Sequence, residues 1–133
     1  MVHLSLTPPI LGRWFIALCV LAGAAGCGSD VDERPTKWSF ISATIVEPNC
    51  ATANCHSDIT QRGSVNLSER NIGYDTLINR RFVLPGDTSG SSALLYLMNG
   101  QGSLRMPPDM PLSGADIDLI SRWITGCQAP CND

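Results

Sequence analysis

The chain is organised around the stretch Cys50-Ala51-Thr52-Ala53-Asn54-Cys55-His56, which brings two thiols and one imidazole within seven residues. Four residues separate the two cysteines, and the histidine follows the second cysteine directly. Thiols and imidazole are side chains that proteins use for covalent attachment and for metal ligation. This stretch is therefore the expected chemical centre of the chain.

Two cysteines followed at once by histidine form the pattern of covalent haem attachment. Each thiol adds to a vinyl group of the haem, and the histidine faces the iron as its proximal ligand. The usual spacing has about two residues between the cysteines, and the additional residues here can bulge outward because only the sulfurs must reach the vinyl groups. Three other interpretations stay open: a Cys50–Cys55 disulfide, a zinc site completed by Cys127 or Cys131, and an ordinary surface position for His56.

Methionine is the expected source of a second ligand to such an iron. Once the N-terminal segment is removed, His56 is the only histidine, so a methionine thioether is the natural second ligand within one chain. Met106 is the first candidate because the two prolines that follow it restrain the backbone. Met110, which also precedes a proline, is the second candidate.

The N-terminal segment predicts export and a lipid anchor. Arg13 precedes an apolar run over residues 14–25, which is shorter than the roughly 20 residues of a membrane-spanning helix and is typical of a secretory signal. Ala24-Ala25-Gly26-Cys27 resembles a bacterial lipobox, which implies a lipid on Cys27; ordinary cleavage nearby is the alternative. We expect a signal peptide over residues 1–26, a polar tether over 27–37 and one folded domain over 38–133.

Composition narrows the class of protein. The 133 residues amount to 14.3 kDa, which is one small domain at most. A net charge of −3 does not favour binding to a nucleic acid, and six cysteines favour an oxidising compartment. No nucleophile–histidine–carboxylate motif, paired carboxylates or phosphate-binding loop is recognisable, so we do not expect an enzyme.

Apolar spacing predicts an all-α domain of three to five short helices with long loops. A first helix carries Ile41 and Ile45 on one face together with Phe40 and Thr44, and Pro48 is expected to end it. Ser68 is expected to cap a second helix that carries three apolar side chains, Ile72, Leu77 and Ile78.

The C-terminal half has clearer signals. Residues 85–87 (Pro-Gly-Asp) predict a turn, and residues 94–98 predict a short helix that ends at Gly100. Residues 100–111 are rich in glycine and proline, so we expect neither a regular helix nor a central strand there. Ser113 and Asp116 predict the start of a last helix that ends at Gly126 and has an apolar stripe formed by Ile117, Ile120, Trp123 and Ile124.

The order of these motifs resembles that of c-type cytochrome domains, in particular the planctomycete-type domain found on bacterial lipoproteins. The resemblance covers residues 40–126. It rests on residues 45–50 (Ile-Val-Glu-Pro-Asn-Cys), the C-x4-C-H motif, Pro85-Gly86-Asp87, Arg105-Met106-Pro107-Pro108, and a last helix that contains Arg122-Trp123-Ile124. It implies a small cytochrome c-like fold around one haem, in which the first helix crosses the last.

The resemblance also implies roles for individual residues. Cys50 and Cys55 would attach one haem c per chain, His56 would be its proximal ligand, and Met106 would be its distal ligand. If haem takes the first two cysteines, Cys127 and Cys131 remain to pair as a disulfide.

The function expected from these features is that of a mono-haem cytochrome, held by a lipid on Cys27 at the periplasmic side or the surface of a bacterial envelope. It would carry single electrons between envelope redox proteins, with no nucleic-acid partner. The alternative is a haem-free binding or structural lipoprotein module that disulfides hold together.

Overall fold

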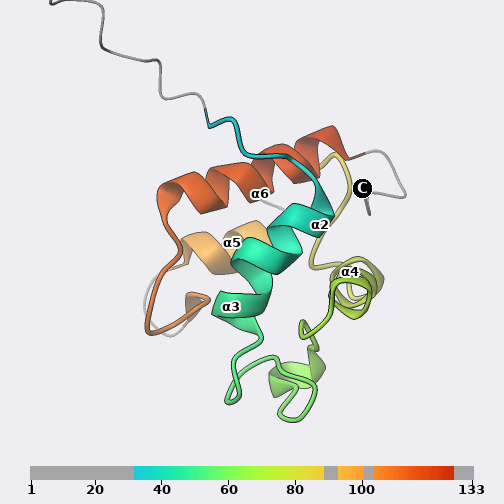
Figure 1. The fold of residues 1–133 in the computed structure, drawn as a ribbon, viewed down its shortest axis with the longest axis vertical. Coiled ribbons are helices and arrows are strands. Elements are labelled where there is room, and N and C mark those ends of the chain that lie inside the picture. Colours follow the sequence, from blue (N-terminus) through green and yellow to red (C-terminus); the bar gives the residue numbers. More distant parts are fainter. Residues whose placement is uncertain (1–31, 89–92, 101–103, 128–133) are drawn as a thin grey trace, which may run out of the picture. The chain divides into compact units, whose positions relative to one another are not determined.

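The computed structural model describes residues 32–88, 93–100 and 104–127. Within these ranges the chain forms helices, turns and loops and no strand, which confirms the all-α prediction. None of the helices in these ranges is long and apolar enough to cross a membrane. The elements (Figure 1) are α2 (Trp38–Ile41), the π-helix η3 (Ser42–Val46), α3 (Glu47–Cys50), the 3₁₀ turn η4 (Arg62–Ser64), α4 (Arg70–Asn79), α5 (Ala93–Asn99) and α6 (Gly114–Gly126).

The first helical segment continues without interruption through residues 38–50. The prediction that Pro48 ends this segment is therefore wrong. Pro48 lies in the first turn of α3, where proline is tolerated, and the turn before it widens into a π-helix. Ile41 and Ile45 are buried as expected, whereas Thr44 is exposed.

The N-cap of helix α4 lies one residue later than expected. Glu69 occupies the N-cap position, and its side chain makes no capping hydrogen bond. Ser68 instead donates its backbone N–H (3.0 Å) and its hydroxyl (2.6 Å) to Oδ1 of Asn66, so the hydroxyl is already used in the preceding turn. Leu77 is buried as expected, but Ile72 faces solvent and is 40% exposed.

The remaining elements agree with the sequence. The N–H of Asp87 donates to the carbonyl of Leu84 (3.0 Å) and closes the predicted turn, in which Gly86 has a φ of 78°. Helix α5 ends immediately before Gly100. The hydroxyl of Ser113 accepts the N–H of Asp116 (3.1 Å) and caps α6, which ends at Gly126 as predicted.

The core includes the contact of α2 with α6 (Figure 1) and that of η3 with α4. The rings of Trp38 and Trp123 have centroids 5.0 Å apart, and the indole N–H of Trp38 donates to the carbonyl of Arg70 (2.8 Å). Ile41 and Ile120 are almost completely buried in the same apolar cluster. The first helix therefore packs on the last, as expected.

The end of the predicted tether is part of the folded domain. Arg34 pairs with Asp32 (2.9 Å) and with Asp116 of α6 (2.5 Å), and Arg122 of α6 reaches back to Asp32 (2.8 Å). Residues 32–34, which the sequence places in the tether, are thus held on α6 by ion pairs. The signal peptide and Cys27 lie outside the described residues.

Candidate functional site

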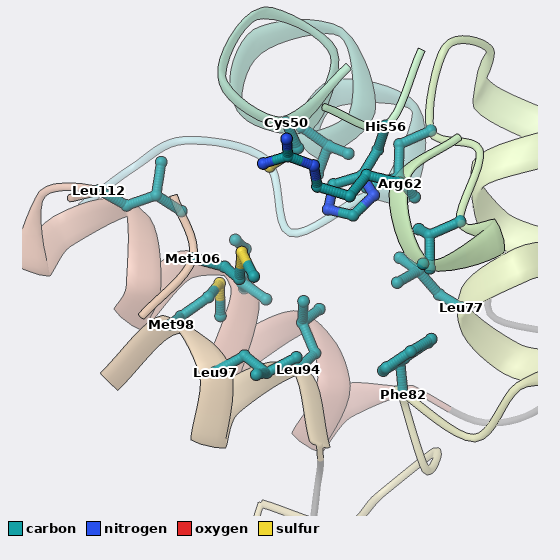
Figure 2. A pocket seen from close by; sticks show the side chains of 15 residues that line it. Cys50, His56, Arg62, Leu77, Phe82, Leu94, Leu97, Met98, Met106 and Leu112 are labelled. Carbon is teal, nitrogen blue, oxygen red and sulfur yellow. The ribbon is translucent and has the colours of Figure 1, made fainter. Parts of the chain in front are cut away.

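A cavity of about 240 Å³ lies between the first helical segment, α5, α6 and the loops that connect them (Figure 2). Apart from His56 and Arg62, the side chains that line it are apolar or carry sulfur. The lining residues are Val46, Cys50, His56, Arg62, Gly63, Val65, Leu67, Leu77, Phe82, Leu94, Leu97, Met98, Met106, Leu112 and Ile120. Such a cavity favours a large, mostly apolar ligand.

A second cavity of about 50 Å³ shares four lining residues with the first: Cys50, His56, Arg62 and Met106. It adds Cys55 and the two prolines that follow Met106. Cys50, Cys55, His56 and Met106 therefore gather around two neighbouring cavities, although they come from two segments about 50 positions apart in the chain.

The two cysteines are free thiols. Cys50 is the last residue of α3 and packs against the core. Burial, with a smaller contribution from the neighbouring Cys55, raises the pKa of the Cys50 thiol to about 11. Cys50 is therefore protonated at neutral pH, and its sulfur is a neutral group in an apolar wall.

The loop between the cysteines closes on itself. The N–H of Cys55 donates to the carbonyl of Thr52 (2.9 Å), and the N–H of His56 donates to the carbonyl of Cys50 (3.1 Å). These bonds bring the second thiol and the imidazole back beside the end of α3. Residues 52–54 are exposed, so the additional residues of the C-x4-C spacing bulge into solvent as expected.

His56 is fixed through its backbone, whereas its ring has an unused polar atom. Its carbonyl accepts the N–H of Leu67 (2.8 Å), which joins the loop to the segment before α4. Its Nδ1 is buried and has no hydrogen-bond partner among the described residues. Burying an imidazole nitrogen without a hydrogen-bond partner costs free energy, so this ring is a candidate for interaction with a bound group.

Met106 and Met110 have different surroundings. Met106 lines both cavities and is partly buried, and its N–H donates to the carbonyl of Leu97 at the end of α5 (2.9 Å). Met110 is 73% exposed and lines neither cavity. Met98 of α5 is buried and also reaches the larger cavity (Figure 2).

The sequence did not single out most of the cavity wall. Val65, Phe82 and Leu112 lie in loops or at helix ends, where no periodic pattern marks them. Arg62, the only residue with a permanent charge in the wall, follows the motif by six positions. Its position in a turn with left-handed neighbours gives no sequence signal of a role at the site.

Cys127 lines neither of the two cavities. Cys127 is disulfide-bonded, and because Cys50 and Cys55 are free, its partner lies outside the described residues. Pairing with Cys131 thus stays a prediction. Over the described ranges, no three His, Cys, Asp or Glu side chains are arranged to hold a metal ion.

The residues present are suited to a covalently attached haem. Two free thiols, an imidazole with an unpartnered buried nitrogen, and a thioether converge on apolar space. The thiols are the groups that bond haem vinyl carbons, and one imidazole with one thioether is a ligand pair that c-type haem iron takes. The chain matches no protein-family model, no curated protein and no solved structure.

Proposed function

We propose that the chain is a mono-haem c-type cytochrome that carries single electrons and does not turn over a substrate. The observation that supports this proposal is the convergence of Cys50, Cys55, His56 and Met106 on two neighbouring apolar cavities. A disulfide-held module needs the two cysteines only, and would have no use for an imidazole and a thioether beside them.

Each of these residues has a distinct task under the proposal. The S–H of Cys50 and that of Cys55 each add across a vinyl C=C bond, so that one C–S and one C–H bond form without an oxidant. His56 offers a ring nitrogen from the loop after α3, and Met106 offers its sulfur from the loop before α6. A bound haem supplies a one-electron couple at its iron.

The apolar wall has a task of its own. Leu94, Leu97 and Phe82 line the cavity (Figure 2) and would give a haem bound there an apolar surface. Low polarity around a haem disfavours the more highly charged oxidised form, and a thioether ligand acts in the same direction. Both features favour a relatively high reduction potential.

The proposed location follows from the N-terminal sequence. A lipid on Cys27 would hold the domain at the periplasmic side or the surface of a bacterial envelope, where electrons would pass to and from other envelope redox proteins. Docking residues 32–34 on α6 leaves only residues 28–31 between the lipid and the domain. The domain would therefore stay close to the lipid surface.

A denaturing gel stained for haem tests the proposal. The full chain is expressed with a c-type cytochrome maturation system, beside a variant that carries Cys50→Ala and Cys55→Ala. We expect a stained band for the unaltered chain and none for the double variant, because only thioether-bound haem survives denaturation. Unstained, intact protein with an oxidised Cys50–Cys55 pair would reject the proposal and favour the haem-free module.

A further inference from the structure

The helical segment that leads into the attachment motif contains a widened turn. The N–H of Glu47 donates to the carbonyl of Ser42, five residues earlier, and residues 42–46 form a π-helix. Short π-helical turns add one residue to an α-helix and are frequent at functional sites. Here the wide turn leads directly into α3, whose last residue is Cys50.

A side-chain hydrogen bond spans the same five residues. Ser42 is 1% exposed, and its hydroxyl donates to Oε1 of Glu47 at 2.8 Å. In an α-helix, five residues advance by about 500°, so two such side chains would point about 140° apart. The hydrogen bond is therefore compatible with the π turn and not with a regular α-helix.

Pro48 favours the same wide turn. It has no N–H to donate to the carbonyl of Thr44, and in a regular α-helix its ring would clash with that carbonyl. The hydroxyl of Thr44 makes a different bond, to the carbonyl of Phe40 (2.8 Å), on the exposed side of the segment. Ser42, Glu47 and Pro48 together thus encode the π turn.

The extra residue changes where the end of the helix points. One residue added to an α-helix rotates everything after it by about 100°. With the added residue, Cys50 lines both cavities. Without it, the same thiol would be turned about 100° from its present direction and out of the cavity wall.

We propose that Ser42 and Glu47 are positioning residues, which hold the π turn and thereby aim the thiol of Cys50 into the cavity. The use of that thiol for haem rests on the proposed function, whereas its direction does not. The device also explains how a wide C-x4-C spacing brings both sulfurs to one site: the turn sets Cys50, and the closed loop over residues 52–55 returns Cys55.

Four variants of the full chain test the proposal. Ser42→Ala and Glu47→Ala remove the side-chain bond, and Glu47→Gln keeps an acceptor oxygen in place. Thr44→Ala serves as the matched control. It removes a hydroxyl from the same π turn, but this hydroxyl donates to the carbonyl of Phe40, four residues earlier. In haem-free protein, the labelling rate of the Cys50 thiol by a maleimide is measured against that of Cys55 by peptide mass.

We expect Ser42→Ala and Glu47→Ala to increase the labelling of Cys50 relative to Cys55 by a factor of about 5 to 10, which corresponds to the loss of one buried hydrogen bond. Glu47→Gln and Thr44→Ala should leave the ratio unchanged. An unchanged ratio in both disrupting variants would overturn the proposal, as would equal labelling of the two thiols in the unaltered chain. If Ser42→Ala does not fold, Glu47→Ala, at a half-buried position, decides.

A second measurement uses the haem-loaded protein. The absorption band of the denatured pyridine complex distinguishes haem held by two thioethers from haem held by one. We expect the disrupting variants to carry mostly haem bound through Cys55 alone. Two intact thioethers in both disrupting variants would overturn the positioning role and leave the proposed function standing. A colourless unaltered chain would reject the function, and the labelling experiment would still test the turn.

Discussion

Two methionines that are alike in sequence differ in their surroundings. Met106 and Met110 each precede a proline, and they are four positions apart. Met106 is tied to α5 by its backbone hydrogen bond to Leu97 and reaches both cavities, while Met110 is 73% exposed. A sulfur that is already held at the cavity loses less entropy when it binds a metal than one that must leave solvent.

This difference predicts unequal effects of removing each sulfur. Met106→Ala should leave haem attached, remove the sulfur-to-iron absorption band and lower the reduction potential, since the thioether raises it. Met110→Ala is the matched control and should change neither property. Visible spectra and potentiometric titration of both variants check this expectation. A lost band in the Met110 variant with an unchanged Met106 variant would assign the ligand to Met110.

Two glycines offer a further comparison at the scale of single residues. A Cβ at Gly73 in α4 would meet Trp38 at 3.5 Å and Leu67 at 3.6 Å, which is ordinary contact. A Cβ at Gly100 would lie 3.2 Å from the carbonyl oxygen of Leu104, in the loop that carries Met106. The first position can accept a methyl group, and the second cannot without moving the backbone.

Gly73→Ala should therefore raise the free energy of unfolding by about 0.5–1 kcal/mol, because alanine favours the helix. Gly100→Ala should lower it by about 1–3 kcal/mol through overpacking. Urea titrations followed by the fluorescence of the tryptophans measure both values. Equal effects of the two substitutions would contradict the packing described around them.

The elements differ in how far the sequence predicts them. Helix α6 and its capping by Ser113 follow from local signals, because cap, apolar stripe and terminal glycine all agree. The prediction that Pro48 ends the first helix was wrong because a wider turn can accommodate a proline. The hydrogen bond from Ser42 to Glu47, five residues later, holds that turn. The docking of residues 32–34 depends on charges about 80 to 90 positions away, for which the local sequence has no signal.

The contact between residues 32–34 and α6 has a predictable pH dependence. The hydrogen bond from Arg34, helped by the charge of Arg122, lowers the pKa of Asp32 to about 2. Burial opposes the shift at Asp116, but hydrogen bonds from Arg34 and Ser113 still lower its pKa. A carboxyl whose pKa is lower in the folded state than in the unfolded state stabilises the fold at a pH above its unfolded-state pKa. This contribution is lost as the pH falls through the folded-state pKa.

The stabilisation from Asp32 should thus be complete above about pH 4 and decline toward pH 2. We expect Asp32→Asn to be less stable than the unaltered chain at pH 6, with a difference that shrinks as pH falls through this window. Urea titrations at a series of pH values measure it. Asp75→Asn, at an exposed carboxylate that pairs with no side chain of the described ranges, is the control. A difference independent of pH would contradict the ion-pair account.

At the scale of the whole molecule, the cavity is large for so small a domain. Its volume is about 240 Å³ and its wall is mostly apolar, so without a ligand this apolar surface stays in contact with water. A domain of this size is stable by only about 5–15 kcal/mol in total.

The candidate site could be predicted only in part. Residues 50–56 are adjacent in sequence, and Met106 is followed by two prolines, so both give a local signal. The other residues of the cavity wall come together only in the assembled fold, so the local sequence does not mark them.

Filling the cavity should therefore stabilise the molecule strongly. We expect the melting temperature of the haem-loaded chain to exceed that of the haem-free chain, by about 4–8 °C for each kcal/mol that burial of the apolar wall adds. Circular dichroism at a helix-sensitive wavelength during heating measures both forms, because the described fold is helical. Equal melting temperatures would show that the haem does not fill the cavity.

The mass of the purified, exported chain under denaturing conditions tests the central claim most directly. Covalent haem adds the mass of one haem to the chain and remains after unfolding, because two thioether bonds hold it. We predict one haem per chain, localised by proteolysis to the peptide that contains Cys50, Cys55 and His56. A chain without added haem, lighter by two hydrogens at a Cys50–Cys55 disulfide, would contradict the account.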